Sequence, residues 1–121
     1  MPGTLYHLGD VPVLWYVPDE PVLAGEQDAN DLIAQAWQHE ARWVAVPVTG
    51  IAADFFRLRT GVAGQVVQKF VNYRIGLAVV GDLTAHLDGS RALTDFVREC
   101  NQGSQTWFVA DLEELHRRLA G

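Results

Sequence analysis

The sequence has little cysteine, no long apolar run and few basic residues, and each shortage excludes a class of protein. Cys100 is the single cysteine among 121 residues, which rules out an internal disulfide and a metal site built from several thiolates. No uninterrupted apolar stretch approaches the roughly 18 residues needed to span a bilayer. The opening residues Met1, Pro2 and Gly3 lack the basic start and apolar core of a signal peptide. We therefore expect a cytoplasmic protein.

Basic charge is scarce as well. Lysine and arginine together number 9, against 15 aspartates and glutamates, so the formal net charge is −6. This balance disfavours broad electrostatic binding to nucleic acid or to anionic membranes. The expected partner is therefore a protein or a small anionic ligand, with neither nucleic acid nor membrane involved.

Familiar catalytic and cofactor motifs are also missing. The histidines His7, His39, His86 and His116 are scattered and form no HExxH pair or comparable group of metal ligands. No Gly-x-Ser-x-Gly elbow, Walker phosphate loop or dinucleotide fingerprint occurs. The sequence thus predicts no metal site and no cofactor, and it leans away from an enzyme.

What the sequence does contain is a regular alternation of strand and helix patterns over residues 1–121, a length that suits one domain with one core. Gly9 and Asp10 suit a tight turn between two short apolar stretches, which predicts an N-terminal hairpin or edge strand. Strands are expected at 5–8, 11–17, 43–48, 75–80 and 106–110, and helices near 29–37, 60–71, 90–100 and 111–119. Right-handed crossovers would fold this order into an α/β domain with a mostly parallel five-stranded sheet and about four helices.

Residues 54–64 form the most informative stretch, because they contain charged residues, two aromatics and two glycines between an expected strand and an expected helix. Thr60 can be a helix N-cap, whose hydroxyl accepts a hydrogen bond from a backbone N–H group. Alternatively, Gly61 and Gly64 leave N–H groups accessible at a positive helix end, where Arg57 and Arg59 add charge. Thr60 would then belong to an anion-binding or phosphorylatable site. The sequence leaves both interpretations open.

Three further residue types complete the candidate site. Asp54 can form a turn, or it can orient an arginine or bind a ligand. On a regular strand Phe55 and Phe56 would point to opposite faces, and one of them would then cover the Thr60 region or contact a partner. On a short helical turn both could instead pack into the core. Asp82 follows the strand at 75–80 and is expected beside the Thr60 loop, either as a ligand contact or as a turn residue.

Tryptophan is abundant for a chain of this size, with residues Trp15, Trp37, Trp43 and Trp107. One of the four can lie exposed at a self-association surface, since a core this small commonly needs fewer. A homodimer is therefore one prediction, and complete burial of the tryptophans is the alternative.

The order of elements resembles the STAS domain, the fold of anti-sigma-factor antagonists. In that family the loop after the third strand presents a phosphorylatable serine or threonine at the N-terminus of the second helix. Here Thr60-Gly61-Val62-Ala63-Gly64 occupies the equivalent place, after an insertion at residues 50–59. The resemblance implies a single STAS-like domain and makes Thr60 a candidate switch residue.

A second resemblance covers nearly the whole chain. The residues that carry it are Asp54-Phe55-Phe56, Thr60-Gly61, Ala63-Gly64, Gln68-Lys69-Phe70, Asn72-Tyr73-Arg74, Leu77-Ala78-Val79-Val80-Gly81-Asp82 and Asn101. On these residues the chain resembles a bacterial family catalogued as a domain of unknown function and numbered 4180. That family has no established activity, so the resemblance implies the fold and the site without a function.

Two functional hypotheses follow. The first is a non-enzymatic regulatory or protein-interaction domain that presents residues 54–64 and the second helix to a partner, with modulation by anion binding or phosphorylation at Thr60. The second is a small-ligand-binding protein or enzyme whose anion-binding pocket lies between residues 54–64 and Asp82. A concave site would favour the second hypothesis, and a flat or convex surface the first.

Overall fold

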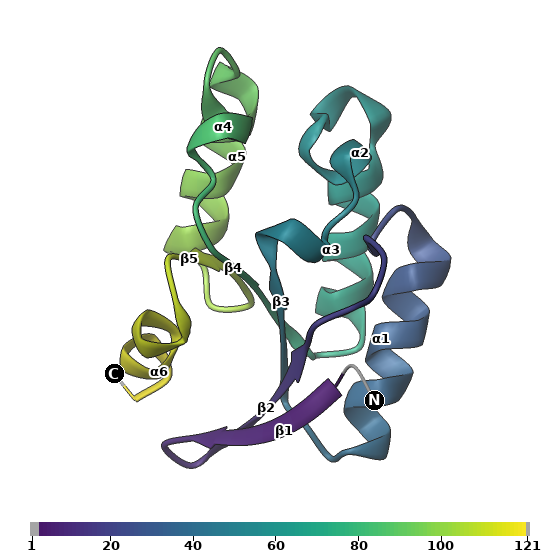
Figure 1. Cartoon of the computed structure of the whole chain (residues 1–121), viewed down its shortest axis with the longest axis vertical. Helices are drawn as coiled ribbons and strands as arrows, with labels where there is room; N and C mark the ends of the chain where they lie inside the picture. The colour runs from purple at the N-terminus through teal and green to yellow at the C-terminus, as the bar shows by residue number, and fades with distance from the viewer. Residues whose placement is uncertain (1–2, 121) are drawn as a thin grey trace.

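A five-stranded sheet lies at the centre of the computed structural model, which describes residues 3–120 (Figure 1). The strands are β1 (Gly3–Leu8), β2 (Val11–Tyr16), β3 (Trp43–Pro47), β4 (Gly76–Val80) and β5 (Thr106–Val109). The longer helices are α1 (Glu26–Gln38), α3 (Val62–Asn72), α5 (Arg91–Gln102) and α6 (Leu112–Ala120). Single-turn helices α2 (Ala53–Phe56) and α4 (Thr84–Leu87) and the 3₁₀ turns η1 (Val48–Gly50) and η2 (Leu58–Thr60) complete the described part.

The strands lie in the order β1-β2-β3-β4-β5, so each strand pairs with its neighbour in sequence. The predicted hairpin is confirmed: β1 and β2 pair antiparallel across a turn in which Gly9 has φ +64°. The three remaining pairs are parallel, each joined through a helical crossover. The expected mostly parallel sheet is therefore corrected to a mixed sheet, because the tight turn after β1 reverses the chain before the crossovers begin.

The two faces of the sheet are covered unequally. Side chains from α1, α3 and α5 pack with one set of alternate strand residues, including Val44, Val46 and Leu77. The other set, including Trp43 and Ala45, packs with α6. This division follows from the period of two along a strand, and it explains why β3 and β4 are apolar at nearly every position.

The four helices expected from apolar spacing are present, and two single-turn helices add to them. α5 begins after the predicted cap, since the Ser90 hydroxyl accepts from the Leu93 N–H at 3.3 Å. At the start of α6, Asp111 accepts from the Glu114 N–H at 2.8 Å, while the Glu114 carboxylate accepts from the Ala110 N–H at 2.7 Å. Among residues 3–120, no helix is long and apolar enough to cross a membrane.

A stack of side chains lies between the sheet and α6. The Trp43 and Trp107 rings are 4.5 Å apart and nearly parallel, and the Arg118 guanidinium lies 4.5 Å above the Trp107 ring. Gly76 of β4 lies beneath Trp43, and a Cβ atom at that glycine would come 2.2 Å from the indole ring. Gly76 is therefore required by the close approach of the ring rather than by its own backbone angles.

Candidate functional site

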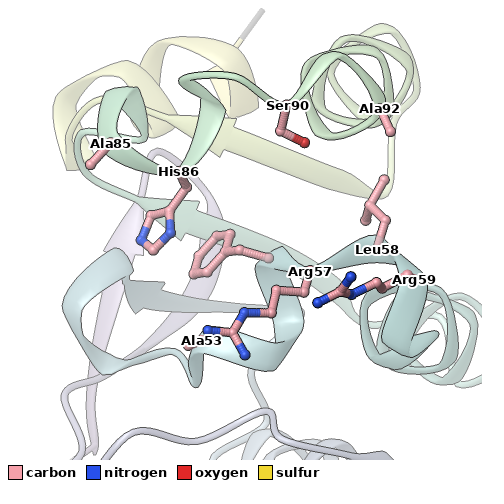
Figure 2. A pocket seen from close by; sticks show the side chains of 9 residues that line it. Ala53, Arg57, Leu58, Arg59, Ala85, His86, Ser90 and Ala92 are labelled. Atoms are coloured by element: carbon pink, nitrogen blue, oxygen red, sulfur yellow. The ribbon is translucent and has the colours of Figure 1, made fainter.

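A cleft lies at the carboxyl ends of β3 and β4, the edge at which parallel sheets gather their functional loops. One wall is the segment from α2 to η2, and the other wall is formed by α4 and the start of α5 (Figure 2). The cleft has a volume of about 560 Å³. We call it the arginine cleft, and its lining residues are Ala53, Phe56, Arg57, Leu58, Arg59, Ala85, His86, Ser90 and Ala92.

Thr60 shapes the first wall by closing the loop upon itself. Its hydroxyl lies 2.8 Å from the Asp54 carbonyl oxygen and 2.7 Å from the Arg57 carbonyl oxygen, and it accepts from the Val62 N–H at 3.2 Å. α3 starts at Val62, two residues after Thr60, and the intervening Gly61 adopts the left-handed conformation with φ +79°. The hydroxyl therefore accepts a hydrogen bond from the first residue of α3, and it also holds the turns α2 and η2 together.

The clamped loop directs two arginines along one wall of the cleft. Arg57 and Arg59 are both exposed and line the cleft together, and Figure 2 shows their side chains on the same wall. Asp54 lies 3.6 Å from Arg57 and offsets part of its charge. Arg59 makes no ion pair with any residue in the described range 3–120, so its guanidinium is free to receive an anion.

The opposite wall contributes an aromatic platform and a helix end. The His86 ring stacks on Phe56 with ring centres 4.0 Å apart and planes 18° apart, and this contact joins the two walls of the cleft. Ser90 and Ala92 lie at the start of α5, a helix of 12 residues, where partial positive charge and unbonded N–H groups favour an anion. The lining of the cleft therefore combines positive charge, from the arginines and the start of α5, with apolar side chains.

Several residues expected at the site lie elsewhere. Phe55 and Phe56 are both buried on the single turn α2 and contact each other edge to face at 5.3 Å, but only Phe56 also lines the cleft, so Phe55 has the core role alone. Gly61 and Gly64 are exposed but do not line the cleft. Asp82 is also outside it.

Asp82 instead begins α4. Its carboxylate accepts from the Thr84 hydroxyl at 2.5 Å and from the Thr84 backbone N–H at 2.9 Å. The Thr84 hydroxyl and then its N–H favour the ionised carboxylate and lower the pKa of Asp82 below its ordinary value of 3.8. Of the two roles open from the sequence, the structure gives Asp82 that of a turn residue.

Sequence reasoning missed the second wall of the cleft. His86 lay in a region with no helical or strand pattern, and Ser90 was interpreted only as the cap that it also is. The signal was nevertheless present, because residues that follow neighbouring parallel strands meet at one edge of the sheet. Applying that rule to the segment after β4 would have brought His86 and Ser90 toward the Arg57–Arg59 loop.

The metal-ligating, thiol and hydroxyl groups of the described chain can each be placed relative to the cleft. Residues 3–120 contain no group of three or more histidine, cysteine, aspartate or glutamate side chains arranged to hold a metal ion. Cys100 lies outside the cleft, and burial, followed by the charge of Glu99, raises the pKa of its thiol to about 11. The Ser90 hydroxyl is engaged in capping α5.

Comparison with known proteins places the chain in a family. Searches of the curated proteins and of the solved structures gave no significant match. A family model described as a domain of unknown function matches residues 8–119, a span that contains the whole arginine cleft. A match over this much of the sequence shows that the chain belongs to the domain of unknown function family DUF4180.

Proposed function

We propose that this protein is a non-enzymatic binding domain that takes a small anionic ligand in the arginine cleft. The observation that carries the proposal is the convergence of Arg57 and Arg59 with the start of α5 around one hollow of about 560 Å³. Guanidinium groups and helix N-termini are both well suited to bind phosphate and carboxylate groups. A chain with a net charge of −6 would otherwise repel such ligands.

The shape of the cleft supports an anion with an apolar body. Phe56, Leu58, Ala85 and Ala92 provide apolar lining, while Arg57 and Arg59 lie along the wall opposite α5. A phosphomonoester or carboxylate attached to a ring or short hydrocarbon would satisfy both parts of the surface. Inorganic phosphate alone would use only the charged part, and we expect it to bind more weakly.

Calorimetric titration with phenyl phosphate and with inorganic phosphate tests this proposal. Arg59→Gln is expected to weaken phenyl phosphate binding by about tenfold, the loss typical of one charge-assisted hydrogen bond. Arg117→Gln is the matched control, because it removes the same charge from an exposed side chain on α6, which is not part of the cleft. Equal weakening by both variants, or no binding of phenyl phosphate by the wild type, would rule the proposal out.

The Thr60 clamp supports a regulatory role for the same loop, the role that a resemblance to the STAS domain would imply. Within this proposal, ligand binding to Arg57 and Arg59 stabilises the clamped loop, and phosphorylation of Thr60 releases it. A phosphate on the Thr60 oxygen would place negative charge against the Asp54 and Arg57 carbonyl oxygens, which now lie within 2.8 Å of that oxygen.

Hydrogen exchange distinguishes this switch from simple capping. Thr60→Glu should increase exchange across residues 54–62 and weaken phenyl phosphate binding, whereas Thr60→Ser should leave both near wild type because the hydroxyl is kept. Thr60→Val removes the hydroxyl without adding charge. If Thr60→Val and Thr60→Glu have identical effects, the role of Thr60 is structural and the charge switch is wrong.

A further inference from the structure

A second cavity lies at the edge of the sheet opposite the arginine cleft. It has a volume of about 490 Å³ and lies at the amino ends of β3, β4 and β5. We call it the amino-edge cavity. A cavity of this volume is within the range that small-molecule ligands occupy in proteins. The residues of its lining that matter for its chemistry are Arg42, Trp43, Arg74, Gly76, Ser104 and Gln105.

Arg42 and Arg74 give this cavity its charge. Both residues are exposed, and neither makes an ion pair within residues 3–120. The chain has 15 aspartates and glutamates, all within the described range, and none of them lines the cavity. On a chain with a net charge of −6, a hollow lined by two arginines and no acid is a local positive field that attracts an anion.

The sheet holds the two arginines next to each other. Trp43 of β3 is in register with Gly76 of β4, while Arg42 precedes Trp43 by one residue and Arg74 precedes Gly76 by two. Neighbouring strands lie about 4.8 Å apart, so the two side chains leave the backbone from adjacent positions. The Arg42 backbone is fixed on both sides, because its N–H donates to the Pro12 carbonyl at 2.8 Å and its carbonyl accepts from the Gly76 N–H at 3.0 Å. One small molecule in the cavity can therefore contact residues from both strand starts.

Arg74 adopts a backbone conformation that favours glycine. Its φ is +59°, and it directly follows Tyr73, the residue that caps the end of α3. The Arg74 N–H donates to the Val71 carbonyl at 3.1 Å, and the Ile75 N–H donates to the Phe70 carbonyl at 3.0 Å. Glycine is the usual residue at the left-handed position of this helix ending, because it has no Cβ atom to clash. The backbone therefore does not select arginine here, which directs attention to what the side chain does in the cavity.

We propose that the amino-edge cavity binds a small organic dianion, of which a dicarboxylate is the simplest example. The planar guanidinium group matches a carboxylate with two parallel hydrogen bonds, and two such groups suit a ligand with two negative charges. Ser104 and Gln105 add a hydroxyl and an amide that make no side-chain hydrogen bond within the described residues, so they are free to bind a polar ligand body. This ligand is distinct from the anion with an apolar body proposed for the arginine cleft, and the two sites lie at opposite edges of the sheet.

Titration of the whole chain followed by backbone amide NMR tests the proposal, because it reports each site separately. Succinate is the probe, and propionate, which has a single carboxylate, is the ligand control. We expect succinate to shift the signals of residues 42–43, 74–76 and 104–105 more than those of residues 53–59, and to bind about tenfold more tightly than propionate. Arg42→Gln should weaken succinate binding by about tenfold, whereas Arg117→Gln on α6, outside the cavity, should leave it unchanged.

Arg74→Gly separates ligand binding from a purely structural role, since a cation at a helix C-terminus also interacts favourably with the helix dipole. With glycine at the left-handed position, the urea midpoint should rise while succinate binding weakens by about tenfold. A midpoint that falls while binding is unchanged would assign Arg74 to the helix end and overturn the proposal. Equal binding of succinate and propionate, shifts that miss the cavity residues, or wild-type binding by Arg42→Gln would each overturn it as well.

Discussion

Replacement of Gly64 by alanine should make the isolated monomer more stable. The residue lies at the third position of α3, outside the left-handed region of backbone angles, and an added methyl group meets no atom within 4 Å. Alanine is favoured over glycine within a helix by about 0.5–1 kcal/mol, mainly because it restricts the unfolded chain. Because Gly64 is in the first turn, we expect a gain near the low end, about 0.5 kcal/mol in the free energy of unfolding.

Replacement of Gly76 by alanine should instead lower the free energy of unfolding, so it serves as a direct comparison. Its added methyl group would come 2.2 Å from the Trp43 ring, whereas carbon atoms in contact normally lie about 3.5–4.0 Å apart. The ring must therefore move by more than about 1 Å. That movement is opposed by Trp107, whose ring centre lies 4.5 Å from that of Trp43. Overpacking of this kind costs about 1–3 kcal/mol.

Urea unfolding followed by far-ultraviolet circular dichroism measures both effects, at about 1 µM protein so that association does not contribute. The midpoint should rise for Gly64→Ala and fall for Gly76→Ala, with the dependence on urea concentration unchanged. In a Trp43→Ala background, the cost of Gly76→Ala should largely disappear, because the clashing ring is gone. A clear loss of stability from Gly64→Ala would show that the added methyl group is not accommodated in the folded chain, and the reasoning about that glycine would be wrong.

Three further predictions concern single side chains. The Thr106 hydroxyl is buried with no hydrogen-bond partner within the described residues, so Thr106→Val should raise the free energy of unfolding by up to about 1 kcal/mol, and a loss in urea unfolding would reveal an unrecognised partner. Asp82 has a lowered pKa, so its ionised form stabilises the fold above pH 3.8 and the contribution is lost as pH falls through the lower folded-state value. Thr84→Ala should bring the titration of Asp82, followed by NMR, back toward 3.8, and an unchanged midpoint would contradict the assigned cause. Cys100 should react with iodoacetamide much more slowly than a free cysteine at mildly alkaline pH and accelerate toward pH 11, whereas rapid labelling of the folded protein would contradict its raised pKa.

Apolar spacing in the sequence determined the main elements of the fold. The four longer helices and five strands could be located from residue periodicity, because a helix or strand buries one face whatever lies opposite it. Local side-chain chemistry also fixed the starts of α5 and α6, since Ser90 and Asp111 bond to backbone groups only three residues away. These features depend on contacts within a few residues, so a linear pattern contains the necessary information.

The local sequence pattern could not predict the structure of segments for which two conformations fit it equally well. Phe55 and Phe56 read as a short strand or as a helical turn, and only packing of both rings into the core selected the turn α2. Asp82 was compatible with a ligand contact or a turn, and its bonds to Thr84 selected the turn. The helix expected near Thr60 begins at Val62, because Thr60 ends the turn η2 and Gly61, in the left-handed conformation, separates that turn from α3.

The sequence by itself therefore determined which segments are helices and strands, and it made the loop with Arg57 and Arg59 a candidate functional site. Only the tertiary structure decided what faces that loop. His86 and Ser90 come from a segment about 30 residues later in the chain, and the parallel pairing of β3 with β4 brings that segment to the same edge of the sheet. Trp37 and Tyr73 likewise meet only because α1 and α3 cover the same face. The physical reason is that periodicity records the burial of each element, whereas a cleft or an interface depends on which elements the sheet places side by side.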